Sequence, residues 1–170
     1  MKSDTIAAIA TALSDAGIGI IRISGPEAIA VANRVVVNKK KEHTLKNWQT
    51  HTIHYGFVEE NGTILDEVMV SVMKAPRSYT TEDTVEINCH GGVLLTKRVL
   101  EAVLHAGARM AEPGEFTKRA FLSGRIDLSE AEAVMDLIQA KNQFSMQASI
   151  KQLRGSVAEK VKSLRAALLY

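Results

Sequence analysis

The segment 78–92, SYTTEDTVEINCHGG, places the only cysteine of the chain, Cys89, beside His90 and two glycines. A cysteine and a histidine within hydrogen-bond reach can form a nucleophile and its base. If residues 84–89 form a strand, however, successive side chains point to opposite faces, and Cys89 shares the apolar face with Val85 and Ile87. We therefore predict a structural, buried role for Cys89 rather than a reactive thiol.

Two charged residues lie inside strand-like apolar segments, where a charge needs either a partner or water. Glu86 stands in TVEINC, and Arg22 interrupts GIGIIRIS. For Glu86 the pattern alone leaves open a solvated strand face or a binding site. For Arg22 it leaves open a structural ion pair, an edge residue or a ligand contact.

The glycines that follow His90 predict a turn from a strand into a helix. Free backbone N–H groups at such a turn can receive an anion, but the need for glycine in a tight turn is sufficient to explain them. No G-x-x-x-x-G-K-[ST] pattern occurs in the sequence. The chain is therefore not expected to hydrolyse GTP or ATP through a Walker-type phosphate loop.

The composition limits the class of protein. The chain has 170 residues, a net charge of +2 and a single cysteine, which excludes an internal disulfide framework and fits a reducing, cytoplasmic setting. The first residues lack the apolar core of a signal peptide. No apolar run approaches the roughly 20 residues that span a bilayer, so no membrane association is expected.

The hydrophobic pattern up to about residue 125 predicts an α+β domain, because strands and helices are mixed without regular alternation. Asn61-Gly62 predicts a hairpin turn. One predicted helix opens on Pro26, and another ends on Gly107. The predicted strands cover 4–11, 17–24, 51–60 and 64–73, and the predicted helices cover 26–36 and 91–107.

The sequence from Asp127 onward is helical in character, with a capping box predicted from Ser129 and Glu132. Gly155 is expected to bend or break this helical stretch. Apolar residues recur at steps of three and four, which indicates a stripe that packs on further protein or on a second copy. The stripe consists of Ala131, Met135, Ile138, Ile150, Leu153, Val157, Val161, Leu164 and Leu168.

Five segments in this order resemble the N-terminal part of the MnmE (TrmE) family of tRNA modification GTPases. They are DTIAAIAT, GIGIIRISG, APRSYTTEDTVEINCHGG, GARMAEPGEFTKRAFLSGRIDLSEAEAVMDLIQAK and QLRG. The resemblance implies a mixed-sheet tetrahydrofolate-binding and dimerisation domain, similar to that of aminomethyltransferases, over residues 1–118. The start of an all-α helical domain then covers 119–170.

Further expectations come from the same resemblance. Three folate-contacting positions of the family match Arg22, Glu86 and Arg125, whereas Thr81 stands where the family commonly has glycine. The family uses 5-formyl- or methylene-tetrahydrofolate, forms homodimers and acts with the flavoprotein MnmG. Together they add an aminomethyl or carboxymethylaminomethyl group at carbon five of the tRNA wobble uridine. Its sites for GTP, magnesium and potassium lie in a GTPase domain without a counterpart in these residues.

Two other functions are compatible with the sequence. One is a stand-alone folate-dependent transferase, although no general acid, base or nucleophile stands in a persuasive setting. The other is an inactive fragment that keeps the fold and binds nothing. Folate binding separates the inactive fragment from the other two possibilities, and aminomethyl transfer without GTP would identify the transferase.

Overall fold

The computed structural model describes residues 4–168, and the chain divides into two compact units. The first unit ends at Phe116 and contains a β-sheet with helices, and the second begins at Thr117 and is helical. The predicted α+β domain followed by helices is therefore confirmed at the level of fold class.

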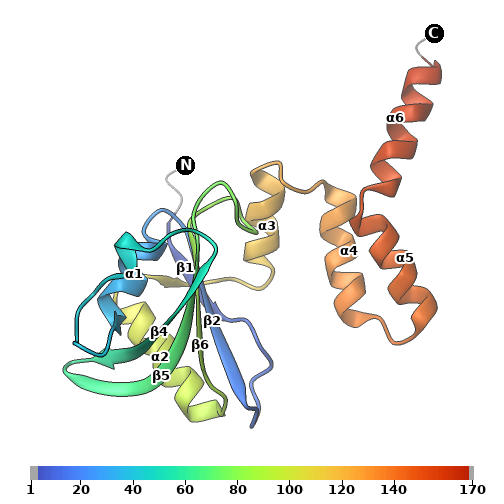
Figure 1. Cartoon of the computed structure of the whole chain (residues 1–170). Helices are drawn as coiled ribbons and strands as arrows, with labels where there is room; N and C mark the ends of the chain where they lie inside the picture. Colours follow the sequence, from blue (N-terminus) through green and yellow to red (C-terminus); the bar gives the residue numbers. More distant parts are fainter. Residues whose placement is uncertain (1–3, 169–170) are drawn as a thin grey trace. The chain divides into compact units, whose positions relative to one another are not determined.

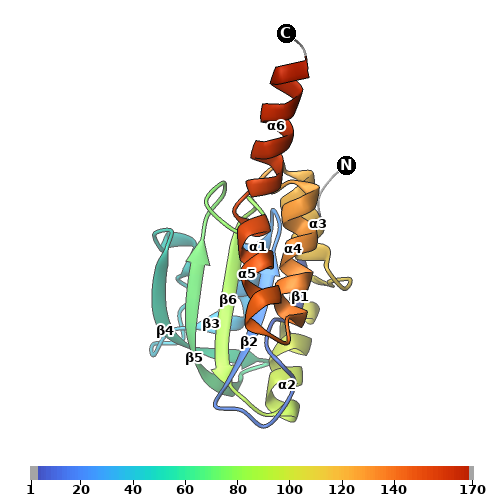
Figure 2. The same cartoon turned by 90° about the vertical axis from the view of Figure 1, so that its right-hand side faces the viewer.

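The first unit is built on a mixed seven-stranded sheet with the order β3-β4-β5-β6-β2-β1-β7. Figure 2 shows β4, β5, β6, β2 and β1 side by side in this order. Neighbouring strands are antiparallel except β1 and β7, which run parallel. The strands are β1 (Ile6–Ile9), β2 (Ile18–Ser24), β3 (Val36–Val37), β4 (Thr52–Glu60), β5 (Thr63–Met73), β6 (Thr84–His90) and β7 (Arg109–Met110).

The hairpin between β4 and β5 forms where the sequence predicts it. Asn61 and Gly62 have φ values of 52° and 80°. This left-handed region costs little at asparagine and nothing at glycine. The turn therefore sets the pairing of two long strands near one edge of the sheet.

Helices α1 (Ala28–Val35) and α2 (Val93–His105) cover one face of the sheet (Figure 1). They bury Val31 and Val99 against Ile21, Ile87 and Val70 of the sheet in one hydrophobic core. Removing this apolar surface from water is the main source of stability for the unit. The opposite side of the sheet, which carries Arg22 and Glu86, is called the second face below.

The start of α1 differs from the sequence prediction, whereas the end of α2 agrees with it. Pro26 precedes the helix, which begins at Ala28, because the turn is fixed by hydrogen bonds outside the helix. The backbone N–H of Glu27 donates to Oγ1 of Thr5 at 2.9 Å. Gly107 follows α2 with φ 113°, as expected of a glycine that ends a helix.

Four further helices follow in the described residues: α3 (Glu115–Leu122), which starts at the end of the first unit, α4 (Leu128–Gln139), α5 (Gln143–Leu153) and α6 (Ser156–Leu168). A single-turn 3-10 helix, η1, covers Leu45–Asn47 in the first unit. Among the described residues, no helix is long and apolar enough to cross a membrane.

The capping box predicted from Ser129 and Glu132 is wrong. Asp127 caps α4 instead, because its carboxylate accepts the N–H of Glu130 at 2.8 Å. The side chain of Glu130 accepts the N–H of Asp127 at 2.7 Å in return. Ser129 donates its hydroxyl to Asp127 at 2.8 Å and so supports the cap without forming it.

Gly155 separates α5 from α6 with φ 78°, which confirms the predicted break. Beyond it, the side chains of Val161, Leu164 and Leu168 are 58%, 65% and 84% exposed. The predicted stripe is thus uncovered at these positions. The side chain of Val157, another member of the stripe, lies outside the described part of the structure.

Candidate functional site

Arg22 and Glu86 are direct cross-strand neighbours on the two central strands β2 and β6. Side chains alternate along each strand, so both project from the second face while Ile21, Ile23, Val85 and Ile87 enter the core. The predicted alternation of TVEINC is therefore confirmed. The structure also brings together the two charged residues that the sequence singled out separately.

The two side chains form a charged hydrogen-bonded pair. Nε and Nη2 of Arg22 each lie 2.8 Å from the same oxygen, Oε1 of Glu86. The side chains are 32% and 22% exposed, so the pair is partly desolvated yet reachable from solvent. Such charge-assisted contacts hold both groups in a defined orientation.

The pair leaves binding capacity on both partners. Arg22 uses the edge formed by Nε and Nη2, and Glu86 uses one of its two oxygens. Within the described residues, Nη1 of Arg22 and Oε2 of Glu86 have no further partner. A guanidinium has five N–H donors and a carboxylate has several acceptor sites. A ligand with a donor near an acceptor can therefore bind without breaking the ion pair.

A separate shallow hollow lies on the second face, farther along β6 toward His90, and neither Arg22 nor Glu86 is among the residues that line it. The strand pairing places Asn88 between Met69 and Ile20, two residues along β6 from Glu86 and on the same face. The hollow has a volume of about 230 Å³ and includes Asn88, Met69 and Tyr55 in its lining. This is below the roughly 300–1,000 Å³ of pockets that bury drug-sized ligands. The hollow fits a ring-sized group rather than a whole extended ligand.

Two aromatic residues lie near Arg22, and no pattern in the sequence predicts that they do. The guanidinium carbon of Arg22 lies 5.6 Å from the ring centre of Phe116 and 6.0 Å from that of Tyr79. Both distances are within the range of cation–π attraction. Both residues belong to motifs that carry the family resemblance, but nothing in the motifs indicates that they meet Arg22.

The loop that carries Tyr79 contains an unusual backbone conformation. Thr81 has φ 64°, which is a genuine outlier for a β-branched residue. This is the position where the resemblance leads one to expect glycine. Threonine is therefore held in a conformation that glycine adopts without strain.

Arg125 lies in the second unit, in the turn between α3 and α4. Its backbone N–H donates to the carbonyl oxygen of Ala120 at 3.0 Å, which closes the end of α3. Because Arg125 belongs to the other unit, the geometry of the site is given by Arg22 and Glu86. The folate role of Arg125 stays a prediction.

Cys89 and His90 do not form a catalytic pair. Cys89 is buried, and its thiol donates to the carbonyl oxygen of Gly19 at 3.3 Å. Burial, followed by the charge of Asp66, raises the pKa of the thiol and so disfavours the thiolate. His90 instead contacts Asp66, with 2.8 Å between Nδ1 and Oδ1. The predicted structural role of Cys89 is confirmed.

Asp66 raises the pKa of His90 above its ordinary value, through their hydrogen bond and then through its charge. The contact between protonated His90 and Asp66 therefore stabilises the folded state. This contribution is fully present below about pH 6.5 and is lost as pH rises through the pKa of His90 in the folded state. We expect a histidine NMR titration to give a midpoint above 6.5 for His90. In Asp66→Asn the midpoint should fall, and an unchanged midpoint would contradict the pairing.

The fold and the site together describe an α+β domain with a charged, partly exposed ion pair on the second face of its sheet. The family model described as GTP-binding protein TrmE N-terminus matches residues 5–125. The chain therefore belongs to the TrmE N-terminal family.

Curated relatives agree with this family. A tRNA modification GTPase MnmE from Lachnoclostridium phytofermentans is 59% identical over 169 residues, which is 99% of this chain. Proteins with the same name from Listeria welshimeri and Bacillus subtilis are 54% and 52% identical over 99% and 98% of this chain. The chain spans only 37%, 36% and 36% of the lengths of these three relatives.

Proposed function

We propose that this chain is the tetrahydrofolate-binding and dimerisation module of a tRNA modification GTPase, with a fold related to aminomethyltransferases. In this proposal the whole protein acts in the cytoplasm with the flavoprotein MnmG on the wobble uridine of tRNA. The ligand is 5-formyl- or methylene-tetrahydrofolate, which supplies the one-carbon unit when bound. The names of the curated relatives support the tRNA modification part of the proposal.

The observation that carries the proposal is the ion pair between Arg22 and Glu86, which leaves Nη1 of Arg22 and Oε2 of Glu86 available to a ligand. A pterin ring offers N–H groups next to ring nitrogens and a carbonyl oxygen. Oε2 of Glu86 can accept a pterin N–H, because Oε1 is already occupied by Arg22. The Nη edge of Arg22 can donate to a carbonyl or carboxylate oxygen of the same folate.

Arg125 supplies the third contact in this proposal, from the second unit. The proposed division at residues 118 and 119 assigns Arg125 to the helical domain and the other two residues to the folate domain. Arg125 is suited to a carboxylate oxygen, because a guanidinium binds carboxylates in a planar, two-bonded geometry. GTP, magnesium and potassium are assigned to a GTPase domain that these residues do not include.

Isothermal titration of the 170-residue chain with 5-formyltetrahydrofolate tests the proposed function. We expect saturable binding of the folate and no binding of GTP, since the chain has no Walker-type loop. Sedimentation equilibrium of the same sample should show a dimer. A folate titration without saturable heat, repeated by equilibrium dialysis with the same outcome, would overturn the proposal.

A further inference from the structure

The aromatic rings next to Arg22 are fixed by buried polar contacts one residue away. Glu115, which precedes Phe116, is only 8% exposed and pairs with Arg109. Its carboxylate oxygens accept from Nη2 and Nη1 of Arg109 at 2.7 and 3.1 Å. It also accepts the backbone N–H of Glu112 at 2.8 Å. The start of α3 is therefore tied to β7, which carries Arg109.

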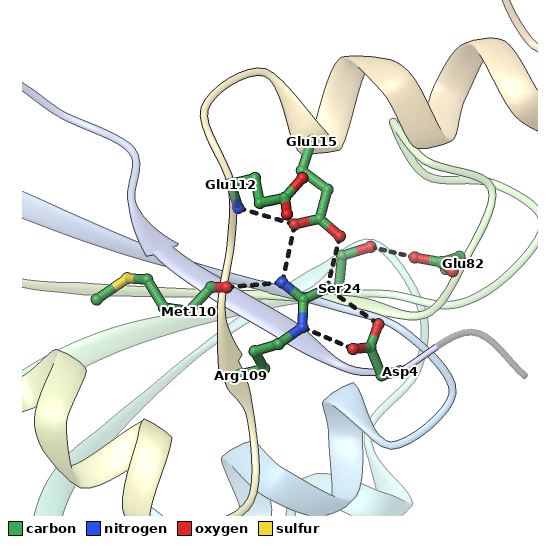
Figure 3. A network of polar contacts seen from close by, with 7 residues as sticks. All are labelled: Asp4, Ser24, Glu82, Arg109, Met110, Glu112 and Glu115. Carbon is green, nitrogen blue, oxygen red and sulfur yellow. Dashed lines mark hydrogen bonds and ion pairs between the residues drawn. The ribbon is translucent and has the colours of Figure 1, made fainter.

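Arg109 is itself held from a second side. As Figure 3 shows, its guanidinium lies between the carboxylates of Glu115 and Asp4. Nε donates to Asp4 at 2.6 Å, and Nη1 donates to the carbonyl oxygen of Met110 at 2.8 Å. A guanidinium bridging two carboxylates in this way has little freedom to rotate. The start of α3, which carries Phe116, is thus linked through Arg109 both to Asp4 and to β7.

The ring of Tyr79 has a comparable anchor. Thr80, the next residue, is 1% exposed, and its hydroxyl lies 2.6 Å from the hydroxyl of Ser24. Ser24 also donates to Glu82 at 2.9 Å, a contact drawn in Figure 3. Ser24 stands two residues after Arg22 on the same face of β2. The loop of Tyr79 is therefore fixed to the strand that carries Arg22.

We propose that Phe116 is a positioning residue for Arg22. Its ring is held in place through Glu115 and Arg109. The ring fixes the guanidinium so that Nε and Nη2 stay on Glu86 and Nη1 remains available to a ligand. An arginine on a flexible side chain would otherwise sample several orientations, and a ligand would have to restrict them on binding. Tyr79 contributes a second ring contact to the same guanidinium.

The first test of this proposal needs no ligand. The Nε–H signal of Arg22 is assigned by its loss in Arg22→Lys and followed by NMR in the 170-residue chain. Phe116→Leu keeps an apolar side chain but removes the ring, so we expect the signal to move and to exchange faster with water. Phe116→Tyr should preserve both properties. An unchanged signal in Phe116→Leu would overturn the positioning role.

Phe57→Leu is a matched control, because Phe57 lies on the same sheet and contacts Tyr55 edge-on with a centroid distance of 5.3 Å. This substitution should leave the Arg22 signal unchanged. If Phe116→Leu fails to fold by circular dichroism, Phe116→Met provides a second side chain without a ring. If the Arg22 signal also moves in Phe57→Leu, the movement reflects a general change of the sheet, and this result would contradict the proposal.

The second test rests on the proposed function and measures affinity for 5-formyltetrahydrofolate. We expect Phe116→Leu to weaken binding by about fivefold, and Phe116→Tyr and Phe57→Leu to stay within about twofold of the unmodified chain. If the unmodified chain does not bind the folate, the proposed function fails while the NMR test still decides the role of Phe116. Equal binding by the unmodified chain and Phe116→Leu would overturn the positioning role alone.

Discussion

Replacing Glu86 with alanine is expected to weaken the binding of 5-formyltetrahydrofolate by at least about tenfold. The variant loses the carboxylate oxygen to which the proposed function assigns a pterin N–H, and a charged hydrogen bond contributes about 1.5–3 kcal/mol. It also releases the Arg22 guanidinium from its fixed orientation. Titration calorimetry on the variant and the unmodified chain measures the difference.

Glu101→Ala is the matched control for this experiment. Glu101 is an exposed glutamate on α2, the helix that covers the other face of the sheet. Glu86→Ala should keep the fold, because the Arg22 side chain is 32% exposed and its charge remains accessible to water. Unfolding curves check this point. Equal affinities of Glu86→Ala and the unmodified chain would remove Glu86 from the site.

Replacing Gly91 with alanine is expected to reduce the free energy of unfolding by about 3 kcal/mol. A Cβ atom at this position would overlap the carbonyl oxygen of Ala16, so the backbone before β2 would have to move. The N–H of Gly91 also donates to the carbonyl oxygen of Gly17 at 3.3 Å, which holds the two segments together. Urea unfolding monitored by circular dichroism measures the loss.

Gly17→Ala is the control for this substitution, since a Cβ there meets no atom within 4 Å. Its unfolding midpoint should stay close to that of the unmodified chain. If both variants unfold at the same urea concentration, the close approach at Gly91 does not limit stability. The glycine after His90 is thus explained by packing, in agreement with the turn that the sequence indicates.

The regular elements of this protein could be predicted where local patterns are strong. The hairpin at Asn61-Gly62, the alternation in TVEINC and the glycine after α2 all depend on a few neighbouring residues. The predicted capping box was misplaced by two residues, because both Asp127 and Ser129 are suited to cap a helix and each has a glutamate three residues later. The two-residue strands β3 and β7 carry too short a pattern to be recognised.

The candidate site could be predicted only in part. Alternation placed Glu86 on a strand face with other polar residues and Arg22 on a face with Ile18 and Ile20, and the pairing of the two charges depends on the register between β2 and β6. A slip of one residue would move one of them to the other face, and no local signal sets this register. The contacts of Tyr79 and Phe116 with Arg22 come from loops and a helix start far along the chain.

The separation of Arg22 and Glu86 by 64 residues has a consequence for synthesis on the ribosome. A growing chain cannot assemble the pair until β6 has left the exit tunnel and joined β2. Contacts between such distant positions close large loops, which slows their formation. Nascent chains that end before residue 84 lack β6 and Glu86 and should therefore not show the folate binding that we propose for the chain.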